Sequence, residues 1–286
     1  MSQTISACLK KGVQFLRSAG VPEAAISAKE LLSHVLKRPR LSLDLDSETQ
    51  IDSQREDEFE SLLAKRATRY PLQYLVRTVG FRDALLEVGE GCLIPRPETE
   101  VLVDAALCEL GRASERVNLL DVGTGSGNVA VSLAKERPNW LVTATDISPD
   151  ALRYAKLNAD RNGVHGQIHF VQTDLWQGVD NCFFDAIVSN PPYLTRLELT
   201  QLQPEVVFEP SAALDGGTDG LLFYKRIIQN AKSVLKLGGF VFFEMGMGQP
   251  PSISKILEAN YFGSIRILQD ASGIERIISA RLVNHG

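Results

Sequence analysis

The segment Asn118-Leu-Leu-Asp-Val-Gly-Thr-Gly-Ser-Gly-Asn128 combines a largely apolar run with three glycines at alternate positions. The apolar residues before Gly123 predict a buried strand, and those after Gly127 predict a helix. Glycines let the backbone turn tightly and let a ligand approach it with no Cβ in the way. The sequence therefore predicts a strand, a ligand-binding loop and a helix in succession.

The residues around this loop favour one kind of ligand over another. A dinucleotide-binding loop would carry its last glycine at position 128, where this chain has Asn128. Asp121 precedes the loop, and a carboxylate there favours a cationic ligand over a pyrophosphate. S-adenosylmethionine carries an ammonium and a sulfonium and no phosphate, so it is the expected cofactor. A purely structural turn is the alternative.

Outward from the loop, strands alternate with helices from Val117 to the end of the chain. Strands are predicted at 117–122, 141–146, 167–172, 184–189, 239–244, 262–268 and 274–281. Helices are predicted at 127–136, 149–161, 219–236 and 250–260. Alternation of this kind indicates a parallel α/β sheet with right-handed crossovers. The break at 270–273 is too short for a crossover helix, so the last two strands should be antiparallel. The predicted fold is a seven-stranded class I (Rossmann-like) methyltransferase domain.

The residues before this domain have a different pattern. Residues 1–77 predict a small helical domain, with apolar residues at helical spacing near the N-terminus and a third helix from Ser53 to about Thr68. Asp52 or Ser53 should cap that third helix. Residues 78–94 predict a β-hairpin linker, and residues 95–286 the methyltransferase domain, with Pro97 in a first helical turn.

Composition and charge are ordinary for a globular protein and bear on whether it binds nucleic acid. Hydrophobic residues make up 44% of the 286 residues, charged residues make up 23%, and the net charge is -5. Residues 1–77 carry 12 basic and 10 acidic side chains, and the rest carry 18 and 25, a net of -7. This argues against a broad basic face for nucleic acid.

The cellular compartment is also indicated by the sequence. No apolar run approaches the ~20 residues of a membrane span, and the N-terminus lacks the apolar core of a signal peptide. The four cysteines (Cys8, Cys92, Cys108 and Cys182) are scattered, so we expect buried free thiols and no metal site. We therefore expect a cytoplasmic protein.

Two carboxylates follow predicted strands at positions suited to a nucleoside. Asp146 lies 19 residues after Gly127, where a carboxylate accepts from ribose hydroxyls. Its alternative role is a helix cap, which Ser148 can also provide. Asp174 can accept from the adenine amino group while Leu175 packs on the ring, and its alternative is a solvated loop position.

The predicted reaction motif is Asn190-Pro-Pro-Tyr193, directly after the fourth strand. Asn190 is pushed toward an extended backbone because a proline follows it, and both prolines fix φ. A rigid segment of this kind can place two hydrogen-bond acceptors, the Asn190 side-chain oxygen and the Pro191 carbonyl, on an amide or aromatic amine nitrogen. Tyr193 would pack against the flat acceptor group. The motif alone fits an adenine, other exocyclic nitrogens or a glutamine amide, and an ordinary Pro-Pro turn is the structural alternative.

Longer motifs carry a resemblance to a known family. The chain resembles the PrmC/HemK family of protein-(glutamine-N5) methyltransferases in the segments Pro71-Leu-Gln-Tyr-Leu75, Leu93-Ile-Pro-Arg-Pro-Glu-Thr-Glu100, 121–127, Asn190-Pro-Pro-Tyr193, Phe208-Glu-Pro210, Ala213-Leu214 and 238–244. The resemblance implies methyl transfer from S-adenosylmethionine to the glutamine of the Gly-Gly-Gln loop in bacterial class I peptide-chain release factors. The product of the cofactor is then S-adenosylhomocysteine.

The resemblance also assigns roles to matching residues. Cofactor binding is expected at Gly123, Thr124, Gly125, Ser126, Gly127, Asp146, Asp174, Leu175 and Asn190. The glutamine site is expected at Asn190, Pro191, Pro192 and Tyr193, of which Asn190, Pro191 and Tyr193 are the catalytic set. The helical domain is expected to recognise the substrate protein.

Arg96 and Glu98 should lie beside the same cleft, and a mutual ion pair that fixes the linker is their alternative role. The chain departs from the family at Arg77, where a glycine is usual, and at Leu175, where an aromatic residue is frequent.

Two other functions stay open at this point. A nucleic-acid amino methyltransferase of the adenine-N6 type would share the reaction motif but would want a basic target-recognition region. A non-catalytic cofactor-binding module would bind without turnover. We expect a monomer that acts on release factors and binds neither membrane nor nucleic acid directly.

Overall fold

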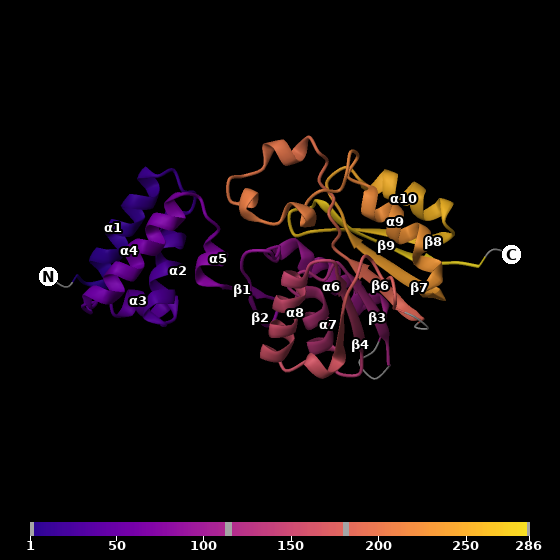
Figure 1. Ribbon diagram of the computed structural model, residues 1–286, viewed down its shortest axis with the longest axis horizontal. Coiled ribbons are helices and arrows are strands. Elements are labelled where there is room, and N and C mark those ends of the chain that lie inside the picture. The colour runs from indigo at the N-terminus through magenta and orange to yellow at the C-terminus, as the bar shows by residue number, and fades with distance from the viewer. Residues whose placement is uncertain (1–2, 112–115, 180–182, 285–286) are drawn as a thin grey trace. The chain divides into compact units, whose positions relative to one another are not determined.

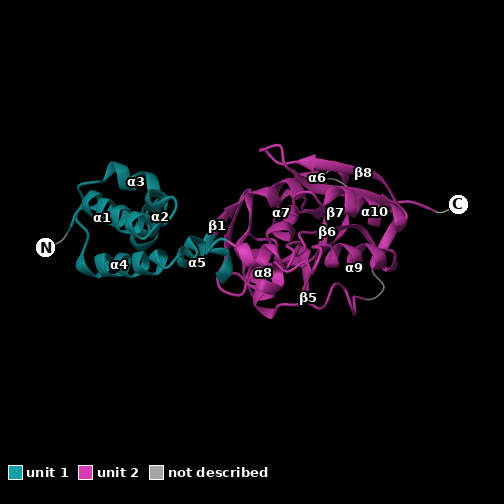
Figure 2. Ribbon diagram, turned by 90° about the horizontal axis from the view of Figure 1, so that it is seen from above, with its two compact units in different colours: residues 1–78, 203–208 teal, residues 79–202, 209–286 magenta. Residues whose placement is uncertain are grey.

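The chain folds into two compact units, each described here by itself (Figure 2). The computed structural model describes residues 3–111, 116–179 and 183–284. Unit 1 comprises Met1–Thr78 and Gln203–Phe208, and unit 2 comprises Val79–Leu202 and Glu209–Gly286. The first division falls one residue after the end of the predicted helical region. The inclusion of 203–208 in unit 1 was not predicted from the sequence.

Unit 1 is helical, with the helices α1 (Ile5–Ser18), α2 (Ala24–Leu36), α3 (Arg40–Leu45), α4 (Ser53–Ala67), α5 (Leu72–Val76) and the 3₁₀ turn η4 (Val206–Phe208). The Thr4 hydroxyl caps α1 by accepting from the Ala7 N–H, and the Asp52 carboxylate caps α4 by accepting from the Arg55 N–H at 3.0 Å. The amphipathic faces meet in one core. Asp52 is therefore the cap among the two candidates.

Two short helices of unit 1, α3 and α5, were not predicted from the sequence. Residues 40–45 form α3. Of its three leucines, Leu43 is buried while Leu41 and Leu45 stay 72% and 78% exposed. A helix of six residues with one buried side chain shows no helical periodicity, so the pattern could not reveal it.

Unit 2 contains the predicted seven-stranded sheet, in the order β5-β4-β3-β6-β7-β9-β8 (Figure 1). The strands are β3 (Asn118–Val122), β4 (Leu141–Asp146), β5 (Ile168–Gln172), β6 (Phe184–Ser189), β7 (Leu235–Glu244), β8 (Phe262–Gln269) and β9 (Glu275–Leu282). The first five of these strands pair in parallel, and β9 pairs antiparallel with both β7 and β8. The class I methyltransferase fold is thereby confirmed.

Helices cover both faces of this sheet and bury two separate cores. The helices are α6 (Glu100–Glu109), α7 (Asn128–Glu136), α8 (Pro149–Arg161), α9 (Leu222–Asn230) and α10 (Pro250–Ala259). Short 3₁₀ turns lie at η1 (Pro97–Thr99), η2 (His165–Gln167), η3 (Glu198–Gln201), η5 (Ser211–Ala213) and η6 (Ala231–Ser233). Leu119 points into the core under α6 and α7, and its neighbour Leu120 points into the core under α9 and α10. Strand side chains alternate between faces, so a parallel sheet covered on both sides needs this continuous apolar run.

Two segments of the chain differ in detail from the sequence prediction. β1 (Thr78–Phe81) and β2 (Ala84–Glu87) form a two-stranded sheet where a hairpin is predicted. The helix predicted at 219–236 is wrong at both ends, because α9 covers only Leu222–Asn230 and β7 begins at Leu235. Leu235 pairs with Phe184 of β6, and this pairing draws residues 235–238 into the sheet.

The cysteines and the helices bear on two further expectations. Cys8 and Cys92 are buried, but Cys108 is exposed, so the expectation of buried thiols is wrong for Cys108. Cys182 lies outside the described residues. No disulfide joins the three described cysteines. Within the described ranges, none of the helices combines the length and apolar character that a membrane crossing requires.

Candidate active site

The glycine loop connects β3 to α7 in a left-handed backbone conformation. Gly123, Gly125 and Gly127 have φ of +71°, +56° and +78°, values that L side chains rarely adopt. A Cβ at Gly123 or Gly125 would meet nothing within 4 Å, whereas a Cβ at Gly127 would lie 3.1 Å from the Cα of Ala155 in α8. Gly123 and Gly125 therefore leave the loop open, and Gly127 lets α7 and α8 approach.

Asp146 ends β4 and holds the loop from beside it. Its Oδ2 accepts from the Gly125 N–H at 2.9 Å, and its Oδ1 accepts from the Ser148 N–H at 2.9 Å. The Ser148 hydroxyl caps α8 by accepting from the Ala151 N–H, so Asp146 is not the cap. Burial raises the pKa of Asp146, although the backbone donors work against that shift.

Asp121 lies beneath the loop, enclosed by protein. It is 2% exposed, and its Oδ2 accepts from the Thr124 hydroxyl at 2.6 Å. Burial raises the pKa of Asp121 to about 7. Asp121 therefore lies buried under the loop and does not line the cavity at the strand ends.

One cavity of unit 2 lies at the carboxyl ends of β3, β4 and β6. Eight sequence-predicted site residues line it: Gly123, Gly125, Asp146, Asp174, Leu175, Asn190, Pro191 and Pro192. The cavity also has apolar side chains that were not predicted from the sequence, among them Leu93, Phe223 and Ile227. Of the described residues in its wall, the only charged ones are Asp146 and Asp174. A cavity with two carboxylates and no basic side chain in that wall suits a cation and lacks partners for a phosphate.

Six predicted site residues do not line this cavity. Thr124 and Ser126 are buried inside the loop, and Gly127 faces α8. Arg96, Glu98 and Tyr193 are the other three. The burial of the Thr124 and Ser126 side chains depends on how the loop packs in the fold, which the local sequence does not show.

The Asp174–Leu175 turn has a strained backbone and a fixed carboxylate. Asp174 Oδ2 accepts from Arg226 Nη2 of α9 at 2.7 Å. Leu175 has φ of +57°, a left-handed value that is costly for a leucine. The carboxylate of Asp174 is therefore already bound to Arg226, and the expected hydrogen bond from the adenine amino group would go to the same carboxylate.

The reaction motif joins a hydrogen-bonded chain of buried groups. Asn190 Nδ2 donates to Thr99 Oγ1 at 3.2 Å, and the Thr99 hydroxyl donates to Glu244 Oε2 at 2.6 Å. The Tyr193 hydroxyl donates to the other oxygen of Glu244 at 3.4 Å. Tyr193 thus faces Glu244 and does not line the cavity. That Tyr193 packs against the acceptor group stays a prediction. Burial raises the pKa of Glu244 to about 7 and also raises that of Tyr193.

Arg96 has a partner that sequence reasoning did not find. Its Nη2 donates to Glu209 Oε1, and Glu209 Oε2 accepts from the Ile94 N–H at 3.0 Å. The mutual Arg96–Glu98 pair considered above is therefore wrong. Glu209 lies within the Phe208-Glu-Pro210 motif, but a carboxylate 113 residues away in the chain has no local signal that identifies it as the partner. Glu244 had a weak signal, as an acidic residue that ends an apolar strand.

These features together define the class of the protein. A glycine loop after β3, a carboxylate after β4 and Asn-Pro-Pro after β6 surround one cavity at the carboxyl edge of the sheet. In open α/β sheets this edge is where ligands bind. The arrangement, on a sheet with antiparallel last strands, is that of a class I methyltransferase.

Comparison with known proteins narrows this class to one family. Residues 7–76 match the PrmC N-terminal domain, and residues 99–217 match the methyltransferase small domain. The chain is 37% identical to a release factor glutamine methyltransferase of Geobacter sulfurreducens, over 94% of this chain and 93% of that protein. It is also 37% identical to one of Cereibacter sphaeroides, over 96% and 97%. The chain belongs to the release factor glutamine methyltransferase family.

Solved structures support the fold alone. The hMettl16 catalytic domain, in complex with a MAT2A 3′UTR hairpin, is similar with a TM-score of 0.58 and 16% identity, over 78% of this chain and 83% of that one. A methyltransferase from Pyrococcus furiosus has a TM-score of 0.54 and 18% identity, over 72% and 92%. At these identities the likeness concerns the sheet and its helices.

Proposed function

We propose that this protein transfers a methyl group from S-adenosylmethionine to the side-chain amide nitrogen of the glutamine in the Gly-Gly-Gln loop of bacterial class I release factors. The observation that carries the proposal is that Asn190-Pro-Pro lines the same cavity as Asp146 and the glycines Gly123 and Gly125. Membership of the release factor glutamine methyltransferase family supports the substrate.

The cavity wall fits the cofactor. Gly123 and Gly125 expose backbone without side chains, and Asp146 offers a carboxylate suited to ribose hydroxyls. Asp174 and Leu175 would contact the base. S-adenosylmethionine, when bound, supplies an electrophilic methyl group on a positively charged sulfur. The negative charge of Asp146 and Asp174 favours that cation.

The Asn-Pro-Pro segment supplies the chemistry of the protein. A carboxamide nitrogen is a weak nucleophile because its lone pair is delocalised. Acceptance of its two N–H groups by Asn190 Oδ1 and the Pro191 carbonyl stabilises the positive charge that develops on the nitrogen. Both prolines hold these acceptors rigidly, and alignment governs the rate of a displacement. A proton leaves the nitrogen afterwards to solvent.

We also assign unit 1 to recognition of the release factor. Every residue that lines the cavity belongs to unit 2, so unit 1 is not needed to form the cofactor wall. Exposed variants in unit 1 should change KM for the release factor and leave KM for S-adenosylmethionine unaltered.

The test is transfer of label from methyl-labelled S-adenosylmethionine to a purified release factor. A release factor with its loop glutamine changed to alanine, duplex DNA and ribosomal RNA serve as parallel acceptors. Label on the intact release factor alone is the expected result. Label on nucleic acid and on neither protein would overturn the substrate and favour an amino methyltransferase of nucleic acid.

A variant separates catalysis from binding in the same assay. Asn190→Ala should reduce turnover at least ~100-fold, because one of the two acceptors is lost, while the Kd for S-adenosylmethionine stays within about 3-fold. Unchanged turnover in this variant would contradict the role given to Asn190.

A further inference from the structure

A hydrogen bond at the amide nitrogen, Nδ2, holds the side chain of Asn190. Its Nδ2 donates to Thr99 Oγ1 at 3.2 Å, and Thr99 donates in turn to Glu244 Oε2 at 2.6 Å. Thr99 is 1% exposed and Glu244 2% exposed, so water does not compete for these bonds. Three residues from η1, the end of β6 and the end of β7 therefore form one buried series.

The series has a direction that the chemistry of its members sets. A threonine hydroxyl has one proton, and here that proton is given to the carboxylate of Glu244. The lone pairs of Thr99 Oγ1 are then left to accept, so the atom of Asn190 that faces Thr99 must be a donor. An amide is planar, with its oxygen and nitrogen on opposite sides. Binding of Nδ2 by Thr99 therefore turns Oδ1 the other way.

Glu244 accepts a hydrogen bond at each of its two carboxylate oxygens. Its Oε2 accepts from Thr99 and its Oε1 accepts from the Tyr193 hydroxyl at 3.4 Å, while its backbone carbonyl accepts from the Tyr224 hydroxyl at 2.8 Å. The ionised carboxylate has no proton to donate, so in that form the bond runs from the Thr99 hydroxyl to Glu244. Tyr193, the last residue of the reaction motif, thus donates to the carboxylate oxygen of Glu244 that Thr99 does not contact.

We propose that Thr99 and Glu244 are positioning residues that select the orientation of the Asn190 amide in which Oδ1, and not Nδ2, faces the nitrogen to be methylated. This inference rests on the proposed function, since the substrate amide offers N–H donors. A flipped Asn190 would present a donor to those donors and would repel the substrate amide at the moment of reaction. The oxygen and nitrogen of an asparagine differ little in shape, so packing alone would not make the choice.

The test compares three threonine variants by steady-state kinetics and calorimetric titration of S-adenosylmethionine. Thr99→Val keeps the shape and removes the hydroxyl, and Thr99→Ser keeps the hydroxyl. Thr143→Val, a half-buried position on β4 outside the cavity wall, is the matched control. We expect Thr99→Val to lower kcat about 10- to 100-fold with the Kd for S-adenosylmethionine within about 2-fold. Thr99→Ser should recover most of kcat, and Thr143→Val should match the wild type.

The role of Glu244 is tested by coupling. Glu244→Gln should lower kcat, because its amide can donate to Thr99 and so release the hydroxyl proton toward Asn190. The double variant with Thr99→Val should lose little more than Thr99→Val alone, since both residues act through one series. Multiplicative losses would show that the two residues act separately and would overturn the proposal.

Other outcomes decide the remaining points. Thr99→Val with kcat within 2-fold of an active wild type would refute the inference and leave the proposed function standing. Equal losses in Thr99→Val and Thr99→Ser, with a matching fall in Tm, would assign Thr99 to packing and also refute it. A wild type that methylates no release factor would count against the proposed function before any variant is compared.

Discussion

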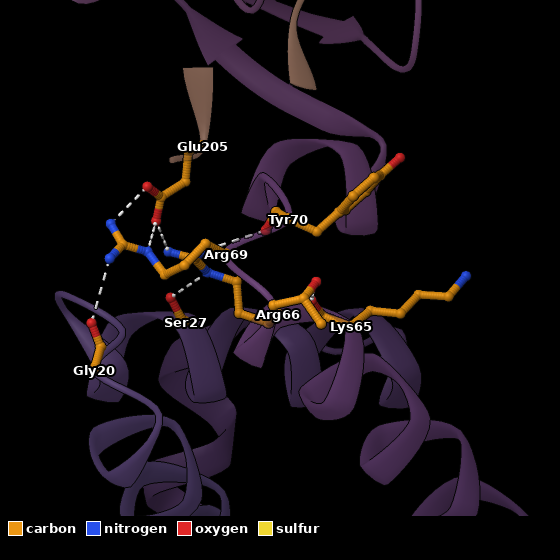
Figure 3. Close-up of polar contacts among 8 residues, drawn as sticks. Gly20, Ser27, Lys65, Arg66, Arg69, Tyr70 and Glu205 are labelled. Atoms are coloured by element: carbon orange, nitrogen blue, oxygen red, sulfur yellow. Dashed lines mark hydrogen bonds and ion pairs between the residues drawn. The ribbon is translucent and has the colours of Figure 1, made fainter. Parts of the chain in front are cut away.

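The carboxylate of Glu205 receives the guanidinium of Arg69 in a two-pronged ion pair, with Nε to Oε1 at 2.7 Å and Nη2 to Oε2 at 2.6 Å (Figure 3). Arg66 Nη2 donates to the same Oε1 at 2.9 Å, and Arg66 Nε donates to Ser27. The rings of Phe208 and Tyr70 pack edge to face at 5.1 Å. Residues 203–208 are thereby tied to the helices of unit 1, 136 residues away along the chain.

Glu205→Gln should loosen this segment. The amide keeps one acceptor oxygen, but an NH2 group replaces the oxygen that accepts from Arg69 Nη2. The negative charge is also lost, so Arg66, with a side chain 7% exposed, is left without its anion. We expect a local cost of about 1–2 kcal/mol, because the one-fifth exposure of Glu205 lets water screen the pair. Hydrogen exchange of residues 203–208 should then be roughly 5- to 30-fold faster. Glu58→Gln, on the exposed side of α4, should leave it unchanged.

Acid should act on the same contact. Burial would raise the pKa of Glu205, but the hydrogen bonds from Arg69 and Arg66 outweigh it and lower that pKa to about 2. A carboxyl whose pKa falls on folding stabilises the folded state above its ordinary pKa of 4.5. The contribution is lost as pH falls from about 4.5 toward 2. Exchange protection of 203–208 that stays constant over this range would disprove the ion pair as its source.

Arg77→Gly should stabilise unit 1. Arg77 follows α5 with φ of +61°, a left-handed conformation that costs an L residue about 1–2 kcal/mol. A glycine there relieves that strain, but part of the gain in stability is lost because glycine gives the unfolded chain more conformational entropy. We expect a net rise of about 0.5–1 kcal/mol in the free energy of unfolding, measured in urea. Arg77→Ala keeps the Cβ and should give no gain, so equal stabilisation by both would show that the arginine side chain was the cause.

Asp146→Asn should weaken cofactor binding more than Asp174→Asn. Asp146 has no cationic partner among its hydrogen-bond contacts, so its charge is available to the ligand. Asp174 shares its carboxylate with Arg226. We expect the Kd for S-adenosylmethionine to rise about 10- to 100-fold in the first variant and less than about 10-fold in the second. The reverse order in calorimetric titration would contradict the assignment of Asp146 to the ribose.

Asp121→Asn should change how stability depends on pH. Burial raises the pKa of Asp121 to about 7 from an ordinary value of 3.8, so the folded state holds a proton that the unfolded chain has lost. The free energy of unfolding of the wild type should therefore fall between pH 4 and 7, by up to about 1.4 kcal/mol per pH unit. The asparagine variant should show a flatter profile and a relative gain above pH 7. Parallel profiles of the two proteins in urea melts would show that Asp121 does not titrate in this range.

The glycine loop and the strand ends show what local pattern can predict. The strand that enters Gly123, the carboxylate at Asp146 and the rigid Asn190-Pro191 step all follow from residues adjacent in the chain. Side-chain alternation and proline geometry operate over a few residues, so their consequences appear in the sequence. Eight predicted site residues accordingly line one cavity.

Several predictions that depend on residues far apart in the chain were wrong. An ion pair between Arg96 and its neighbour Glu98 is one of the two roles that the sequence suggests, but the structure pairs Arg96 with Glu209. Residues 235 and 236 fall within the predicted helix, but pairing with β6 makes them part of a strand. Thr124 and Ser126 belong to the loop motif, yet their side chains point into the protein. Local propensity is weak compared with a paired strand or a filled core, so tertiary contacts prevail.

Local sequence pattern is enough to predict the succession of strands and helices in the methyltransferase domain, the edge of the sheet where the cavity forms and candidate oxygen acceptors there. Periodicity and strand-end chemistry depend only on residues close together in the chain. The hydrogen bonds from Asn190 to Thr99 and from Thr99 to Glu244, and the ion pair by which Glu205 joins residues 203–208 to unit 1, follow from the tertiary fold. Those contacts join residues more than 50 positions apart in the chain. Whether each buried group donates or accepts depends on the protons that its neighbours leave available.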